Sequence, residues 1–376
     1  MRTRGYEPAT QRSATRRNFL KSAASVAALG GGALPASADP LAFSDDGDWR
    51  AYEIRTIVEI GSTEPTHVWV PAASFADPLW SRPLGTDWTG NSSAKLVRDP
   101  VYGAEIVKLE WRAGAGLRRA EIVNRVATRD RSVPLAAGGR AASLTSEQRA
   151  LYLKPTALIP TDGVVKETSD RIVAGAPTDI AKASAIYAWL VANTERIAAT
   201  RGCGSGDIKA TLAAEKLGGK CADINGLFVG LARAAGLPAR DLYGIRVAPS
   251  RFGYKSLGVG SADVTKAQHC RADVWLEGIG WTPMDAADVR KVMLEEPPKN
   301  LAADDPKVAA AREALIGGCE GNWVAFNCAH DVALPGSSGA PVGFLMYPEG
   351  EVAGVRLDCL EPAAFRYRIE AREIPI

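Results

Sequence analysis

The chain has 376 residues, 46% of them hydrophobic and 23% charged, which is an ordinary globular composition. It corresponds to about two domains, and the composition excludes disordered, collagen-like and disulfide-stabilised miniprotein classes. Lys and Arg number 45 against 43 Asp and Glu, so the formal net charge is only +2. A protein that binds phosphate backbones usually carries a larger basic excess, so we expect no nucleic-acid partner.

The first 38 residues have the pattern of an export signal. Arg16-Arg17 precede Phe19-Leu20-Lys21, an Ala/Gly-rich stretch follows at 22–34, and small residues of the kind signal peptidase recognises occupy 36–38. The stretch is too short to span a bilayer, and the paired arginines resemble a twin-arginine motif. We therefore expect export by this route and a soluble periplasmic or extracellular protein without an integral membrane segment. Removal of residues 1–38 would change the formal charge from +2 to −3, because six basic side chains and one acidic side chain leave.

Residues 39–150 show the period-two alternation of β-strands. Apolar or β-branched side chains take the even positions of 52–60, and similar runs occur at 67–70, 104–111 and 121–128, between turns rich in Pro, Gly, Asn and Asp. Strands in this arrangement predict an antiparallel, β-rich N-terminal domain, and we expect a sandwich of two sheets.

Residues 151–300 change to helical periodicity and then return to strands. Helices are predicted at 178–194 and 221–235, followed by strands at 269–276 and 281–285. A helix followed by antiparallel strands predicts an α+β core. We interpret 301–376 as a C-terminal extension that completes the core or a sheet, with one more strand near 365–369.

Cys221 is the candidate nucleophile because it follows two glycines and opens a predicted helix. The free N–H groups and the dipole at a helix N-terminus stabilise a thiolate. The alternative interpretation is a small buried apolar side chain, which is the more common role of cysteine. No Gln, Asn or Trp shortly before Cys221 could complete an oxyanion hole, so only the backbone N–H of Cys221 is available for that role.

His269 and Asp285 are the candidate partners of Cys221. His269 begins one predicted strand, and Asp285 ends the next, so the two residues could meet across a hairpin. A loop over 276–278 would place them opposite each other. A loop centred on Gly278-Ile279 would offset them by three residues, roughly 10 Å, and the sequence does not decide between these registers.

Two blocks of sequence carry a family resemblance. The blocks GGKCADINGLFVGLARAAGLPAR and QHCRADVWLEGIGWTPMDAADVRK resemble the Cys, His and Asp core of bacterial transglutaminase-like proteins, a branch of the papain-like superfamily. The resemblance covers about residues 180–295 and implies a papain-like fold in which a Cys-bearing helix packs on an antiparallel sheet. It implies that Cys221 is the nucleophile, His269 the general base and acid, and Asp285 the orienting residue.

This resemblance implies attack on an amide of a protein or peptide through a thioester. Because water is abundant, we expect hydrolysis; the alternatives are glutamine transamidation, which crosslinks proteins, and a non-catalytic binding protein that retains the fold. Nothing in the sequence resembles a calcium-binding EF-hand loop. We expect no cofactor and no metal, and the sequence does not predict an oligomeric state.

The remaining histidines and cysteines are assigned structural roles. We expect His67 to be a strand residue, and the spacing of Cys319, Cys328 and His330 matches no common zinc module. In an exported protein, one or two disulfides could form among the other five cysteines, with Cys270 left as a free thiol. These five are Cys203, Cys270, Cys319, Cys328 and Cys359. The segment 300–336 is a candidate lid over the cleft.

Overall fold

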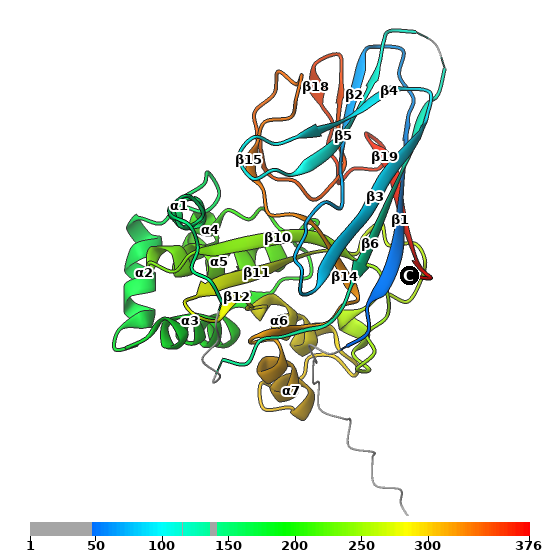
Figure 1. Cartoon of the computed structure of the whole chain (residues 1–376). Coiled ribbons are helices and arrows are strands. Elements are labelled where there is room, and N and C mark those ends of the chain that lie inside the picture. The colour runs from blue at the N-terminus through cyan, green and yellow to red at the C-terminus, as the bar shows by residue number, and fades with distance from the viewer. Residues whose placement is uncertain (1–46, 115, 136–140) are drawn as a thin grey trace, which may run out of the picture. The chain divides into compact units, whose positions relative to one another are not determined.

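A computed structural model describes residues 47–114, 116–135 and 141–376 (Figure 1). The predicted twin-arginine signal, residues 1–38, lies outside the described residues. Within the described part of the chain, no helix combines the length and the hydropathy needed to cross a bilayer.

The β-rich region contains two antiparallel sheets. Its strands are β1 (Arg50–Ile60), β2 (Thr66–Pro71), β3 (Ser81–Gly90), β4 (Ser93–Arg98), β5 (Glu105–Trp111), β6 (Arg118–Thr128), β17 (Glu349–Val352), β18 (Val355–Arg356) and β19 (Arg366–Ile374). The strand orders are β19-β1-β6-β3 and β18-β17-β2-β5-β4. Buried side chains from both sheets share one cluster, including Val58 of β1 and Leu109 of β5. This packing confirms the predicted β-rich sandwich.

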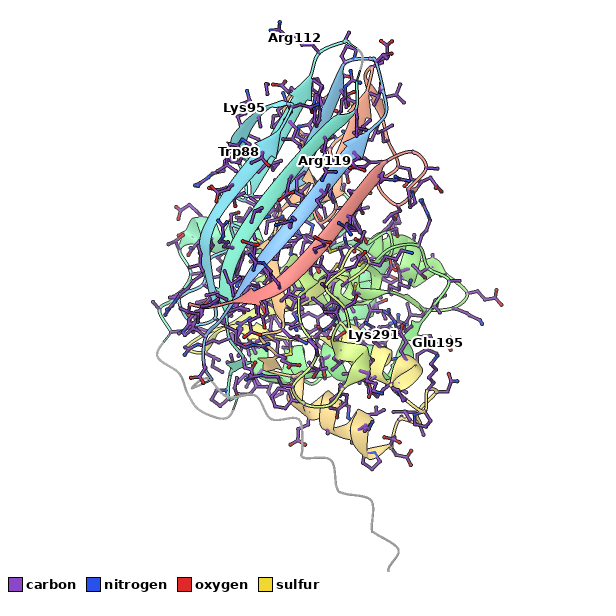
Figure 2. All side chains as sticks on the ribbon, turned by 90° about the vertical axis from the view of Figure 1, so that its right-hand side faces the viewer. Trp88, Lys95, Arg112, Arg119, Glu195 and Lys291 are labelled. Carbon is purple, nitrogen blue, oxygen red and sulfur yellow. The ribbon has the colours of Figure 1, made fainter. Side chains whose placement is uncertain are left out.

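Strands β3 and β4 of the sandwich were not predicted from the sequence, and neither were the short strands β17 and β18. Most side chains of β3 and β4 are exposed, so the alternation that marks a half-buried strand is weak. Trp88 of β3 and Arg119 of the neighbouring β6 are labelled in Figure 2. The predicted strand near 365–369 is β19, which pairs with β1 along nine residue pairs.

The core contains the helices and a second antiparallel sheet. The helices are α1 (Ser146–Leu153), α2 (Gly163–Val173), α3 (Asp179–Asn193), α4 (Ile208–Ala213), α5 (Cys221–Ala234), α6 (Ala286–Glu295), α7 (Pro306–Ala314) and the short 3-10 helix η1 (Lys255–Leu257). The sheet has the order β12-β11-β10-β14, with β10 (Ala239–Arg246), β11 (Gln268–Leu276), β12 (Gly280–Pro283) and β14 (Trp323–Asn327). Helix α5 packs on β10 and β11 (Figure 1). The α+β core is therefore confirmed.

Three short strand pairs connect these larger units. They are β7 (Arg131–Ser132) with β13 (Gly318–Cys319), β8 (Glu195–Arg196) with β9 (Gly218–Gly219), and β15 (His330–Val332) with β16 (Val342–Phe344). The region after residue 300 thus adds β14 to the core sheet and β17, β18 and β19 to the sandwich. The domain boundaries at 150 and 300 stay a prediction.

The hairpin of β11 and β12 has neither of the two expected registers. Trp275 pairs with Trp281 and Leu276 with Gly280, which leaves a three-residue loop over 277–279. Gly278 adopts φ 77°, a backbone conformation that glycine tolerates at little cost. Strand β12 ends at Pro283, so Asp285 does not lie on the hairpin at all.

Candidate active site

Cys221 is the first residue of α5, as the sequence predicts. The preceding glycines form β9, which pairs in parallel with β8 and holds this loop against the core. A Cβ on Gly218 would lie 2.0 Å from the carbonyl oxygen of Glu195, and one on Gly219 would lie 2.2 Å from the Asp223 carboxylate. Both glycines are therefore required by close packing, and the backbone approach they permit places the thiol at the helix N-terminus.

His269 and Asp285 meet, but by a different route from the one expected. His269 Nε2 lies 2.7 Å from Asp285 Oδ2, and both side chains are buried. Asp285 is the N-cap of α6, where its Oδ1 accepts a hydrogen bond of 3.0 Å from the Asp288 backbone N–H. The assignment of Asp285 to the second hairpin strand was wrong, because the chain leaves the sheet after Pro283 and enters a helix.

A second carboxylate, Asp288, was missed by the sequence analysis. Its Oδ2 lies 3.4 Å from His269 Nε2, and both its oxygens accept hydrogen bonds from the Arg246 guanidinium at 2.5 and 2.6 Å. Burial alone would lower the pKa of His269, but the carboxylates of Asp288 and Asp285 outweigh it, so the pKa lies above its usual value. The imidazolium form is therefore favoured in this buried site.

Asn225 fixes the position of Asp285 from the nucleophile helix. Its Nδ2 donates to Asp285 Oδ1 and to the Cys270 carbonyl oxygen, both at 2.9 Å, and its Oδ1 accepts from the Ala287 backbone N–H. Asn225 lies four residues after Cys221 and so on the same face of α5. A polar amide one helical turn after the candidate nucleophile, between Ile224 and Gly226, was the available signal for this role.

Three cysteine sulfurs meet beside the site, and none forms a disulfide. The Sγ atoms of Cys203, Cys221 and Cys270 all lie within 4.8 Å of one another. All six cysteines are free thiols, so the expected disulfides are absent from the structure. Hydrogen bonds from Cys221 and Cys270 hold the pKa of Cys203 well below its usual value, whereas burial raises the pKa of Cys270. Thiolates could hold a soft metal ion at this position.

Cys221 and His269 line the same cavity, whose volume is about 470 Å³. The C-terminal segment contributes another part of its wall, including Tyr347, Leu360 and Phe365. Among the described residues, none from 300–336 lines it, so the expected lid is wrong. That segment instead carries α7 and the edge strand β14. No local sequence pattern indicates this part of the wall, because it depends on the return of the chain to the sandwich.

The other two histidines lie away from this cavity. His67 is on β2, where its Nε2 lies 3.5 Å from Glu110. His330 is buried between the rings of Tyr102 and Tyr243, and its Nε2 lies 3.6 Å from Asp241. No metal group among the described residues includes either histidine. Both positions fit structural roles.

Comparisons with known proteins show the family of this chain. Residues 166–286, which include Cys221, His269 and Asp285, match the family model of the transglutaminase-like superfamily. An uncharacterized protein of Haemophilus influenzae is 35% identical over 334 residues, covering 85% of this chain and 89% of that protein. The chain belongs to the transglutaminase-like superfamily.

Two solved structures are similar at lower identity. One is a protein from Cytophaga hutchinsonii proposed to be a cysteine protease, with 14% identity, a TM-score of 0.49, and coverage of 86% of this chain and 98% of that chain. The other is the periplasmic domain of TgpA from Pseudomonas aeruginosa, with 13% identity, a TM-score of 0.34, and coverage of 65% and 88%.

Proposed function

We propose that this protein is a cysteine enzyme that hydrolyses amide bonds of proteins or peptides. Cys221 is the nucleophile, His269 the general base and acid, and Asp285 the residue that orients His269. One observation carries the proposal: the nucleophile candidate shares a cavity with a histidine whose Nε2 is 2.7 Å from a buried carboxylate. The family membership of the chain supports the same roles.

The orientation of His269 determines which nitrogen exchanges a proton with the thiol. A carboxylate accepts hydrogen bonds, so Nε2 carries the hydrogen that Asp285 accepts, and Nδ1 is left to take the proton of Cys221. The raised pKa of His269 favours this imidazolium, which stabilises the thiolate. Asp285 and Asp288 thus supply the negative charge that the imidazolium needs in a buried site.

Acylation then follows from this proton position. The thiolate attacks the amide carbonyl carbon, a C–S bond forms, and the oxygen becomes an oxyanion near the Cys221 backbone N–H. The His269 imidazolium gives its Nδ1 proton to the leaving amine as the C–N bond breaks. The product is a thioester on Cys221 and a free amine.

Deacylation restores the enzyme. His269, now neutral, takes a proton from water, and the hydroxyl oxygen attacks the thioester carbon. The C–S bond breaks, the thiolate leaves, and a carboxylic acid is released. A primary amine in place of water would give transamidation, so the same site serves both outcomes and the water access of the cavity decides between them.

The test of this proposal is alkylation of Cys221 by iodoacetamide across pH, with mass-spectrometric mapping of the modified peptide. We expect faster reaction near pH 6 than for a small free thiol, and slower reaction in His269→Ala. Cys359→Ala is the matched control, because Cys359 lines the same cavity but lies outside the cluster of Cys203, Cys221 and Cys270. A reaction at the rate of an ordinary thiol, unchanged in His269→Ala, would falsify the proposal.

A second measurement separates hydrolysis from transamidation. Fluorescein-labelled casein is incubated with the protein, with and without dansylcadaverine. We expect small fluorescent peptides that Cys221→Ala does not release. Amine incorporation without cleavage would instead establish the transamidase.

We also propose that residues 1–38 direct export by the twin-arginine route. The paired arginines and the small residues at 36–38 support this. Replacement of Arg16 and Arg17 by lysine is expected to leave the precursor in the cytoplasm, and N-terminal sequencing of exported protein should begin near residue 39. Export of the unprocessed chain would contradict the cleavage site.

A further inference from the structure

The cavity that holds Cys221 and His269 is lined by cations and by no acidic residue. Six basic side chains contribute to its surface, and among the described residues no Asp or Glu does so. The six are Arg196, Arg201, Lys220, Arg246, Lys266 and Lys291. The whole chain carries a net charge of only +2, so the excess of positive charge is a local property of the cavity.

Four of the six cations are already matched by carboxylates outside the cavity surface. Arg246 binds Asp288, Arg196 is paired with Glu295, and Arg201 Nη2 lies 2.8 Å from Asp358. Lys291 of α6, labelled in Figure 2, has its Nζ 3.9 Å from the same Glu295. In these ion pairs, the positive charges of the four basic side chains are largely compensated by the carboxylates.

Lys220 and Lys266 are different, because no described carboxylate lies within 4.0 Å of either ammonium group. Lys220 directly precedes Cys221, and Lys266 lies three residues before His269 in the loop that leads into β11. The acid nearest to Lys266 in sequence, Asp263, does not line this cavity, but it lies with Lys266 in a neighbouring hollow and interacts with it electrostatically. Lys220 and Lys266 therefore bring two cations without a close ion pair, from two separate elements, to the cavity that Cys221 and His269 also line.

We propose that this cavity selects peptides that carry a carboxylate next to the amide that is cleaved, and that Lys220 and Lys266 bind this carboxylate. The inference rests on the proposed function of Cys221. A substrate carboxylate would supply the counter-charge that the wall lacks, without displacing a protein carboxylate from an existing pair. Tyr347, Leu360 and Phe365 also line the cavity and offer apolar surface to the rest of a bound peptide.

The experiment compares two alkylating reagents of similar size, anionic iodoacetate and neutral iodoacetamide, at Cys221. Both react with the same thiolate, so the ratio of their rate constants cancels changes in thiolate population and reports attraction of the anion. We expect the iodoacetate-to-iodoacetamide ratio to fall about threefold in Lys220→Gln and in Lys266→Gln, and further in the double variant. High salt should reduce the wild-type ratio in the same direction.

Lys209→Gln is the matched control, because Lys209 is an exposed lysine of α4 that does not line the cavity. Its ratio should equal that of the wild type. Ratios that are unchanged in both cavity variants overturn the anion subsite while leaving the nucleophile intact. An unreactive Cys221 with iodoacetamide instead overturns the proposed function, and with it the subsite.

Protection of Cys221 from iodoacetamide identifies the source of the carboxylate. Acetyl-Glu-Ala amide carries a side-chain carboxylate, acetyl-Ala-Ala carries a terminal one, and acetyl-Ala-Ala amide carries neither. Stronger protection by the first assigns an acidic side chain, and stronger protection by the second assigns a C-terminal carboxylate. Equal protection by all three peptides overturns the subsite.

Discussion

Two buried histidines lie beside aspartates in this fold, and their surroundings shift their pKa values in opposite directions. His269 is hydrogen-bonded to Asp285, with Asp288 and Arg246 behind it, and its pKa lies above the usual value. His330 is 3.6 Å from Asp241, a distance too long for a hydrogen bond. Burial, assisted by Arg233, lowers the pKa of His330 well below its usual value.

The difference between the two histidines is a difference in hydrogen bonding and charge balance. Two carboxylates contact the His269 ring. One of them, that of Asp288, is kept ionised by the buried guanidinium of Arg246, which donates to both of its oxygens. Burial raises the pKa of Asp241 to about 7, so its carboxylate is a poor counter-charge for His330. Proximity of His and Asp is therefore not sufficient; a catalytic histidine also needs a satisfied carboxylate and access to a cavity.

The largest expected effect is a difference in acylation rate between variants of the two histidines. Acylation by p-nitrophenyl acetate, followed as the release of p-nitrophenol, should fall by about 10³-fold in His269→Ala, because the general base is lost. His330→Gln changes a residue that does not line the cavity and should keep the rate within about twofold. Comparable losses in the two variants would show that the contrast between them has no functional meaning.

The second prediction breaks the orientation of His269 without removing its ring. In Asp285→Asn the new amide oxygen is required at the Oδ1 position, where Asn225 and the Asp288 N–H both donate. The amide NH₂ then faces Nε2 and forces the hydrogen onto Nδ1, which is the tautomer that cannot accept the thiol proton. We expect acylation to fall by about 10²-fold or more.

A tautomer shift gives this second prediction its own readout. In Asp285→Asn, the ¹⁵N chemical shift typical of a protonated ring nitrogen should move from Nε2 to Nδ1 of His269, and the shift typical of an unprotonated nitrogen should move from Nδ1 to Nε2. A slowed variant with an unchanged tautomer would mean that Asp285 acts by charge alone.

The sequence predicted the helices and strands that carry the site because their periodicity is local. Helix α5 and strand β11 begin within a residue of the expected positions. The error at Asp285 came from extending a strand pattern past Pro283, although Asp285 and Asp288 are spaced as an N-cap and an N3 acid. Attention to capping would have placed this residue on a helix.

Other parts of the site depend on contacts that no local pattern encodes. Arg246 lies on β10 and meets Asp288 of α6 only after the sheet has formed. The wall of the cavity depends on the C-terminal segment, which returns past the active site to place β19 beside β1. Periodicity predicted a strand there and could not predict its neighbour.

The third prediction weakens the connection between the nucleophile helix and Asp285. Asn225→Ala leaves the Cys270 carbonyl and the Ala287 N–H without their side-chain partner. We expect a loss of about 2 kcal/mol in the free energy of unfolding and about tenfold slower acylation. Urea denaturation and p-nitrophenol release measure the two effects, and a normal rate with lowered stability would assign Asn225 a purely structural role.

The smallest expected effect tests the other histidine site. The pKa of Asp241 is about 7 in the fold against 3.8 ordinarily, so the folded state holds an extra proton between these values. Stability must then fall as pH rises from about 4 to about 7, since the unfolded chain binds fewer protons there. Asp241→Asn replaces the carboxyl group with an amide that does not ionise, so this loss of stability with rising pH should disappear.

We therefore expect Asp241→Asn to unfold like the wild type at pH 4.5 and to be more stable by about 1 to 2 kcal/mol at pH 7.5. Urea denaturation at both values measures the difference, and His330→Gln serves as the control because it leaves Asp241 in place. If Asp241→Asn instead destabilises the protein at pH 7.5, the carboxylate of Asp241 is a working counter-charge. The two histidine sites would then differ in access to the cavity and not in charge state.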